Sequence, residues 1–209
     1  FLNNACKLIA ENKLCDRILQ AENYSLFFSH PDKSKHAPFG SFIVELAGRS
    51  DEEVLEKMQP RYRSAIRNAM KLNTEIRTGE KELPVFHELY KETMNRTGMY
   101  VSSLNELKQA YACMPGNVIC ANVYHNGIIQ GGVFLYHSLY SAYYIHGASA
   151  ASTVASGLIK YLHYFLMMQL RNQGVRQYDF VGARLTDVRG TKLEGIQNFK
   201  ERFAATLHR

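Results

Sequence analysis

The chain has 209 residues, of which 46% are hydrophobic and 21% charged. This length is enough for one good hydrophobic core, or for one domain and part of another, and the composition is that of a soluble globular protein, which excludes classes marked by compositional bias. The formal charge of +6 favours anionic partners such as phosphates, nucleic acid or a membrane surface, with a solvated basic surface as the alternative.

The first 41 residues are expected to form a helix, a strand and a polar linker. Apolar residues recur at helical spacing over 3–20, and the run over 24–28 is typical of a strand. The polar segment 33–40 contains a proline and a glycine, so we place a domain boundary there. Because the chain begins at Phe1 and not at methionine, we expect it to be a piece of a longer protein.

Residues 42–114 are expected to form one short strand followed by helices. Ser50, with Glu53 three residues later, matches a capping box at a helix start, and Pro60 suits the first turn of the next helix. Glycine and proline mark the ends of two later helices. The expected elements are a strand over 42–46, helices that begin near Ser50 and Pro60, and helices over 83–97 and 103–114.

From residue 118 the apolar period changes to that of strands. Asn126-Gly127 joins two β-rich runs and is a strong hairpin signal. The most apolar helix contains Lys160 and His163, so it is a buried helix and not a membrane span. The expected elements are strands over 118–125, 128–136 and 140–147, a helix over 153–172, and a strand over 177–181. This order predicts an α+β fold with a mixed sheet.

Arginines are concentrated between residues 60 and 69. Arg63 and Arg67 are four residues apart, so they share a face of the expected helix while Ile66 packs inward. Arginine forks bind phosphate oxygens through two hydrogen bonds, and the pair is therefore a candidate phosphate clamp. The alternative is a solvated cationic face in which Arg67 pairs with an acidic neighbour.

Lys200 lies within an aromatic frame near the end of the chain. Phe199 and Phe203 are four residues apart and would anchor a helix with Lys200 beside them, so Phe199 is also a candidate substrate contact. A lysine at a desolvated rim can stabilise an oxyanion that develops on a carbonyl group. The alternative is a lysine that reaches solvent from an ordinary amphipathic helix.

Asp179 and Gly182 are further candidates for substrate binding. Asp179 lies in an expected strand between two aromatic residues, where a carboxylate can orient a cation, accept a substrate amine or form a structural pair. Gly182 lies in a loop that either lets backbone approach a ligand or only shapes a turn. The scattered histidines and the four cysteines, which show no CxxC spacing, match no metal site, and we expect reduced thiols in a cytosolic protein.

Three segments together resemble the FemABX-type peptidoglycan-bridge aminoacyltransferases. They are the run Arg61 to Ala69, the strand segment that begins Gly131-Gly132, and the C-terminal motif Tyr-Asp-Phe-x-Gly-Ala with Gly-Ile-x-x-Phe-Lys-x-x-Phe. That family is built from GNAT-like acyltransferase domains, usually two in tandem. The resemblance implies that residues 42–209 form one such domain, a mixed and mostly antiparallel sheet flanked by helices, and that 1–41 are the trailing part of a first domain. After Phe203 the family usually has a glycine pair, where this chain has two alanines.

The resemblance also implies a chemistry. Lys200 corresponds to the family lysine thought to polarise the aminoacyl ester, and Arg63 or Arg67 would hold phosphates of the acceptor. Family members take an amino acid from charged tRNA and attach it to an amine of a lipid-linked muropeptide or another glycan precursor. The implied setting is the cytoplasm at the inner face of the membrane, with peripheral membrane contact and no cofactor. Because an aminoacyl ester is already activated, positioning and oxyanion stabilisation suffice, and no catalytic triad is needed.

An acyl-CoA-dependent N-acetyltransferase on the same fold is the competing hypothesis. That enzyme needs a Gln/Arg-x-x-Gly-x-Gly/Ala loop, whose backbone amides hold the CoA pyrophosphate at a helix N-terminus. The corresponding segment here, Gly147 to Gly157, has small residues but lacks the paired glycines and the leading Gln or Arg. A non-catalytic relative that binds glycan precursors or RNA is a third class.

Overall fold

The centre of the molecule is an eight-stranded sheet in the order β2-β3-β4-β5-β6-β1-β7, with β8 also beside β1. The computed structural model describes residues 1–15, 18, 30–35, 39–152 and 157–208. All strand pairs are antiparallel except β5 with β6. The strands are β1 (Phe39–Glu45), β2 (Thr74–Thr78), β3 (Val118–His125), β4 (Ile128–His137), β5 (Ser141–Ser149), β6 (Gln177–Asp179), β7 (Ala183–Arg184) and β8 (Thr206–His208). The predicted α+β fold with a mixed, mostly antiparallel sheet is confirmed.

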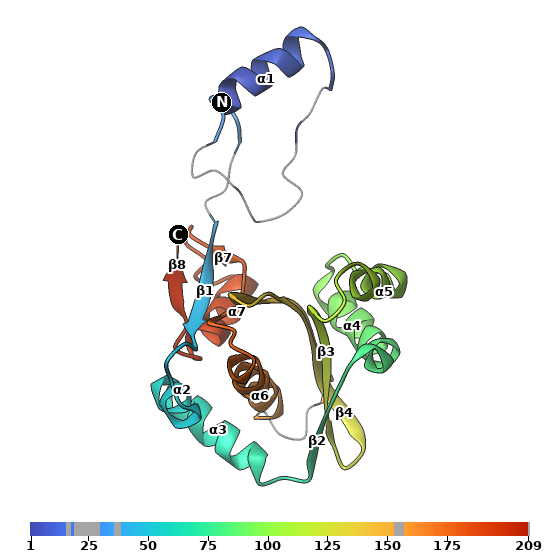
Figure 1. The fold of residues 1–209 in the computed structure, drawn as a ribbon, viewed down its shortest axis with the longest axis vertical. Coiled ribbons are helices and arrows are strands. Elements are labelled where there is room, and N and C mark those ends of the chain that lie inside the picture. The colour runs from blue at the N-terminus through green and yellow to red at the C-terminus, as the bar shows by residue number, and fades with distance from the viewer. Residues whose placement is uncertain (16–17, 19–29, 36–38, 153–156, 209) are drawn as a thin grey trace.

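Helices cover both faces of this sheet (Figure 1). The pair α4 and α5 packs against β3, β4 and β5 on one face, whereas α6 lies on the other face and packs against α3. Each face has its own hydrophobic core, and the α6 core is the larger. The helices are α1 (Leu2–Glu11), α2 (Asp51–Lys57), α3 (Pro60–Met70), α4 (Leu83–Thr97), α5 (Leu104–Cys113), α6 (Leu158–Asn172) and α7 (Lys192–Glu201), and a single 3-10 turn, Glu80–Glu82, precedes α4.

Local signals in the sequence set several of these boundaries. The Ser50 hydroxyl accepts a hydrogen bond from the Glu53 N–H, and the Glu53 carboxylate accepts one from the Ser50 N–H, which completes the predicted capping box of α2. Pro60 is at the start of α3. Asn126 and Gly127 have φ of +50° and +78°, as a two-residue hairpin turn between β3 and β4 requires.

The N-terminal helix is shorter than the sequence predicts. α1 ends at Glu11 instead of continuing to residue 20, and Lys13 already has a φ of +52°. None of the residues of α1 is buried, and Figure 1 shows the helix apart from the sheet, so the sheet does not support a longer helix. The strand expected over 24–28 lies outside the described residues.

Short strands and one helix start also differ from expectation. The sequence does not predict β2, β7 or β8, because each is short and none has a continuous apolar run. The helix expected from residue 153 is α6, which begins at Leu158; residues 153–156 lie outside the described part of the chain. The strand expected over 177–181 ends at Asp179, because the two residues after Phe180 have positive φ.

Candidate functional site

The candidate site lies where β5 and β6 separate. These two strands pair in parallel only between Ser141–Tyr143 and Gln177–Asp179. β5 then continues to Ser149, while β6 has already ended. In open sheets, ligands bind outside the carboxyl ends of strands where the topology reverses, and here β6 has parallel β5 on one side and antiparallel β1 on the other. The sheet therefore presents the unpaired edge of β5 next to the loop that follows β6.

That loop has an unusual backbone. Val181 and Gly182 have φ of +44° and +53°, and positive φ at a β-branched residue such as valine is uncommon and strained. The turn is held by Asp179, whose Oδ1 accepts a hydrogen bond of 2.7 Å from the Val181 N–H. Asp179 is buried, and burial raises the pKa of its carboxyl group, although the Val181 N–H acts in the opposite direction. Two successive carbonyl groups of the loop point toward α7 as a result.

Lys200 of α7 binds both of these carbonyls. Its Nζ donates hydrogen bonds to the carbonyl oxygens of Val181 and, at 3.0 Å, Gly182. The side chain is only 6% exposed, so Lys200 does not extend to solvent. Burial lowers the pKa of the Lys200 amine to about 8, and the Asp179 carboxylate opposes this shift. At neutral pH the amine is mostly charged, and an ammonium has three N–H donors, one more than the two carbonyls use.

An aromatic cluster that includes Phe199, the chain neighbour of Lys200, packs toward α6. Phe199 and Phe203 have ring centroids 5.2 Å apart, and Phe203 lies 5.0 Å from Tyr62 of α3. Phe180, from the loop after β6, lies 5.0 Å from Phe203. Tyr144, the first residue of β5 beyond its pairing with β6, lies 5.9 Å from Phe180. The aromatic cluster is thus built from α3, β5, α7 and the turn that follows it, and the loop after β6.

His163 lies inside this cluster, and its setting could not be predicted from the sequence. It is fully buried, its Nδ1 is 2.8 Å from the Tyr178 hydroxyl, and its Nε2 has no hydrogen-bond partner among the described residues. Its ring lies 5.6 Å from that of Phe199. Burial lowers the pKa of His163 to about 3, so the imidazole is neutral at physiological pH. A single histidine in an apolar helix was the only signal in the sequence.

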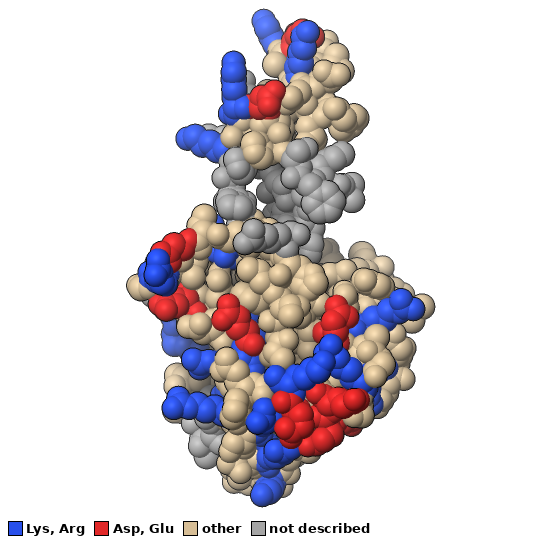
Figure 2. Space-filling model, turned by 90° about the vertical axis from the view of Figure 1, so that its left-hand side faces the viewer, with Lys and Arg blue, Asp and Glu red and all other residues tan. Residues whose placement is uncertain are grey.

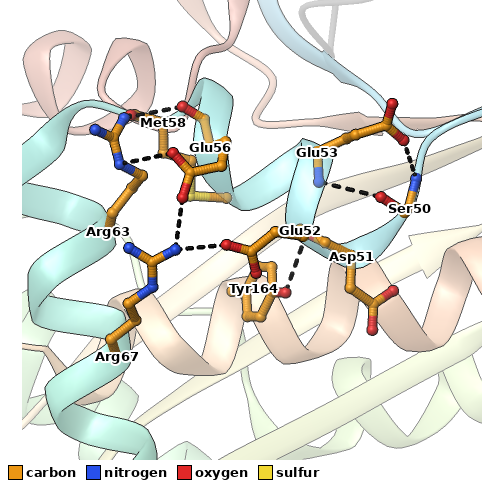
Figure 3. Close-up of polar contacts among 9 residues, drawn as sticks. All are labelled: Ser50, Asp51, Glu52, Glu53, Glu56, Met58, Arg63, Arg67 and Tyr164. Atoms are coloured by element: carbon orange, nitrogen blue, oxygen red, sulfur yellow. Dashed lines mark hydrogen bonds and ion pairs between the residues drawn. The ribbon is translucent and has the colours of Figure 1, made fainter.

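The two candidate arginines of α3 face α2 (Figure 3). Arg67 Nη2 lies 2.5 Å from carboxylate oxygens of both Glu52 and Glu56. Arg63 donates to the carbonyls of Glu56 and Met58, near the end of α2. The alternative in which Arg67 pairs with acidic neighbours is therefore the arrangement observed, and phosphate binding by Arg63 and Arg67 stays a prediction. Figure 2 shows acidic side chains grouped among the basic ones on one side of the molecule.

The structure thus brings together four of the six candidate residues. Lys200, Asp179, Gly182 and Phe199 lie around the loop after β6, where each has the contact described above. From α3 the cluster receives Tyr62, whereas the arginines on the same helix point toward α2. Substrate contact by any of these residues stays a prediction. Within the described residues, no group of three His, Cys, Asp or Glu side chains has the arrangement of a metal site.

Residues 56–201 match the acetyltransferase (GNAT) domain family. The chain belongs to this family. The matched region includes α3, the whole β3–β6 part of the sheet and Lys200. No curated protein sequence matches the chain.

Solved structures share the fold of this GNAT-family chain at low sequence identity. The crystal structure of FemX superposes with a TM-score of 0.76 at 18% identity, over 84% of this chain and 61% of the FemX chain. The C-terminal domain of a protein named as a lysylphosphatidylglycerol synthetase, from Agrobacterium fabrum, gives a TM-score of 0.62 at 12% identity, over 83% and 59% of the two chains. L-PGS from Bacillus licheniformis gives 0.58 at 11% identity, over 82% and 59%. The chain spans about three fifths of the length of these proteins, and the likeness concerns the fold. In the described part of the GNAT-family chain, no helix has the length and apolarity needed to cross a bilayer.

Proposed function

We propose that this GNAT-family chain transfers an aminoacyl group from charged tRNA to an amine of a cell-wall or exopolysaccharide precursor. The observation that carries the proposal is the buried Lys200 ammonium, held by two carbonyls at the point where β5 and β6 separate. The fold shared with FemX, and with a protein named for lysylphosphatidylglycerol, an aminoacylated lipid, supports an aminoacyl donor.

The role of Lys200 follows from its donors. When an amine attacks the carbonyl carbon of an ester, negative charge develops on the carbonyl oxygen. A preorganised, desolvated donor stabilises that charge strongly, because it need not reorganise during the reaction. Two N–H groups of Lys200 are fixed by the Val181 and Gly182 carbonyls, which leaves the remaining one to bind the oxyanion. Asp179 positions this arrangement by fixing the turn at Val181.

The competing acetyl-CoA hypothesis is disfavoured by how the glycines of the segment 147–157 are used. A Cβ atom on Gly147 would lie 1.8 Å from the Tyr144 hydroxyl oxygen, and one on Gly157 would lie 2.3 Å from the Ala65 carbonyl oxygen. Both glycines thus make room for neighbouring protein groups. Glycines that let backbone amides approach a pyrophosphate would instead face open space.

The test compares donors with and without the Lys200 charge. We expect transfer from charged total tRNA to the lysine side chain of a muropeptide. We expect Lys200→Met to lower kcat by about 100-fold or more, as for loss of one oxyanion donor. Binding of charged tRNA should change little. Lys57→Met, at an exposed lysine of α2, removes the same charge and should retain activity.

The alternatives predict other results. Transfer from acetyl-CoA, with indifference to charged tRNA, would replace the proposal by an N-acetyltransferase. Binding of precursor or tRNA without transfer from either donor would indicate the non-catalytic relative. Residues 1–41 as the trailing part of a first domain stay a prediction, so the assay should use the full-length protein.

A further inference from the structure

A second polar cluster lies on the other side of β5. Residues two apart on a regular strand share a face, but the register of β5 against β4 shifts between Tyr144 and His146, and this β-bulge turns their side chains to opposite faces. Tyr144 packs against His163 of α6, whereas His146 packs against Tyr90 of α4. Both residues lie beyond Tyr143, where pairing with β6 stops. The unpaired edge of β5 therefore has the Lys200 cluster on one side and His146 on the other.

His146 belongs to a chain of hydrogen-bonding groups. The Tyr90 hydroxyl lies 3.2 Å from its Nδ1, and the Ser102 hydroxyl lies 3.5 Å from its Nε2. The second distance is at the limit of a hydrogen bond, so Nε2 is only weakly engaged. Ser102 is half-buried in the loop between α4 and α5, in which Met99 and Tyr100 are strongly exposed.

The charges around this cluster differ from those around Lys200. Burial lowers the pKa of His146 to about 4, so its ring is neutral and one nitrogen accepts hydrogen bonds; the Glu106 carboxylate opposes the shift. His87 faces the same loop and hydrogen-bonds the Ser102 carbonyl oxygen. The neighbouring cation, Arg96, is directed at the Ser149 carbonyl, with Nη2 2.6 Å from the oxygen. The cluster thus offers acceptors near a carboxylate, which suits a ligand rich in N–H donors.

We propose that Tyr90, His146 and Ser102 form the binding site for the primary amine of the acceptor, across β5 from Lys200. The proposal rests on the proposed function and deepens it, because it names the group that receives the acyl chain and the side from which it approaches. A donor carbonyl at the edge of β5 would have the Lys200 ammonium on one side and the amine on the other.

The reaction then balances without a cofactor. The lone pair of the neutral amine attacks the ester carbonyl carbon, and a C–N bond forms. The C–O bond to the donor breaks, and its electron pair leaves with the donor oxygen. One proton passes from the amine nitrogen to that oxygen, so the products are an amide and an alcohol. His146 and Ser102 accept hydrogen bonds from the amine and orient its lone pair toward the carbonyl.

The first readout is binding alone, which does not depend on a donor. Protein with ¹⁵N-labelled histidine rings is titrated with Nα-acetyl-lysine amide and, as a matched control, with its Nε-trimethylated form, which has no N–H on the terminal nitrogen. We expect the ring signals of His146 to shift with the amine and not with the trimethylated compound. Unchanged His146 signals up to the solubility limit of the amine, or equal shifts with both compounds, would overturn the site.

The second readout is transfer. His146→Gln and Tyr90→Phe should each raise the KM for the amine about tenfold, the effect of one lost hydrogen bond, and leave the KM for charged tRNA nearly unchanged. His125→Gln, a histidine at the far end of β3, serves as the control. Wild-type kinetics in His146→Gln would overturn the site even if transfer occurs. Amine-dependent shifts of His146 without transfer from charged tRNA would support the amine site and refute the aminoacyl donor.

Discussion

At the scale of single residues, burial of the charged Lys200 amine lowers the stability of the fold, and its local contacts only partly offset this loss. Its pKa lies near 8, against about 10.4 for a lysine in an unfolded chain. That difference corresponds to roughly 3 kcal/mol by which burial of the charged amine disfavours the folded state at neutral pH. Hydrogen bonds to two carbonyls replace part of the hydration that the ammonium group loses on burial. A methionine of similar length would avoid the charge, so the position is better explained by chemistry than by packing.

The pH dependence of stability tests this assignment. Below pH 8, Lys200 is protonated in both states, and the penalty is constant. Between about pH 8 and 10.4 the unfolded chain binds more protons than the folded one, so the stability that Lys200 contributes rises with pH. We therefore compare the free energies of unfolding of wild type and Lys200→Met by urea unfolding. Between pH 7 and pH 10, the value for wild type should rise relative to that of the variant by up to roughly 3 kcal/mol. A stability difference that stays constant between pH 7 and pH 10 would contradict the burial of the charge.

The sequence predicts the candidate lysine better than its partners. The four-residue spacing of Phe199 and Phe203 is local, and it correctly indicates that the two rings pack against each other beside Lys200 in the chain. The carbonyls that bind Lys200 depend on the signs of φ at Val181 and Gly182, which no local pattern specifies. The pairing of Arg67 with Glu52 depends on how α2 and α3 pack, across 15 residues of chain.

At the scale of elements, α6 is positioned by a close approach to α3. Gly157 immediately precedes α6, and a Cβ atom there would lie 2.3 Å from the Ala65 carbonyl oxygen of α3. Backbone atoms cannot move away as side-chain ends can, so this contact fixes how α6 begins. Since α6 carries His163 and α3 carries Tyr62, the contact also sets the aromatic cluster beside Lys200.

Gly157→Ala should therefore destabilise the protein. Overpacking at a backbone contact costs typically about 1–3 kcal/mol, and we expect a loss of that size in the urea-unfolding free energy. Gly195→Ala is a matched control, because Gly195 is an exposed residue of α7 whose added Cβ would meet no atom within 4 Å. That substitution should stabilise α7 by up to about 1 kcal/mol through helix propensity. Equal effects of the two substitutions would contradict the close α3–α6 contact.

Elements with strong local signals are those that the sequence predicts. The capping boxes at Ser50 and Ser103 and the turn at Asn126 fix boundaries through bonds within a few residues. The strand β2 gives no such signal, because it is short, mostly exposed and held by its pairing with β3. α1 likewise ends earlier than its hydrophobic spacing predicts, and none of its residues is buried.

At the scale of the whole molecule, the basic side chains behind the net charge of +6 are not equally free to bind an anionic partner. Arg67 of α3 is paired with two glutamates, so its charge is largely compensated. Arg202, directly after α7, is exposed and makes no ion pair within the described residues, and it lies near the Tyr62 hydroxyl beside the aromatic cluster. An anionic donor that reaches Lys200 would therefore meet Arg202 more readily than Arg67.

The salt dependence of tRNA binding distinguishes the two arginines. Each phosphate contact with a single strand contributes about 0.7 to the slope of log K against log salt, through released counterions. Arg202→Met should reduce this slope by about one contact, whereas Arg67→Met should leave it unchanged. Both substitutions remove one positive charge, so a general effect of net charge would appear equally in both. The reverse result, with the slope reduced only by Arg67→Met, would mean that Arg67 exchanges its glutamates for phosphate, and would support the phosphate clamp predicted on α3.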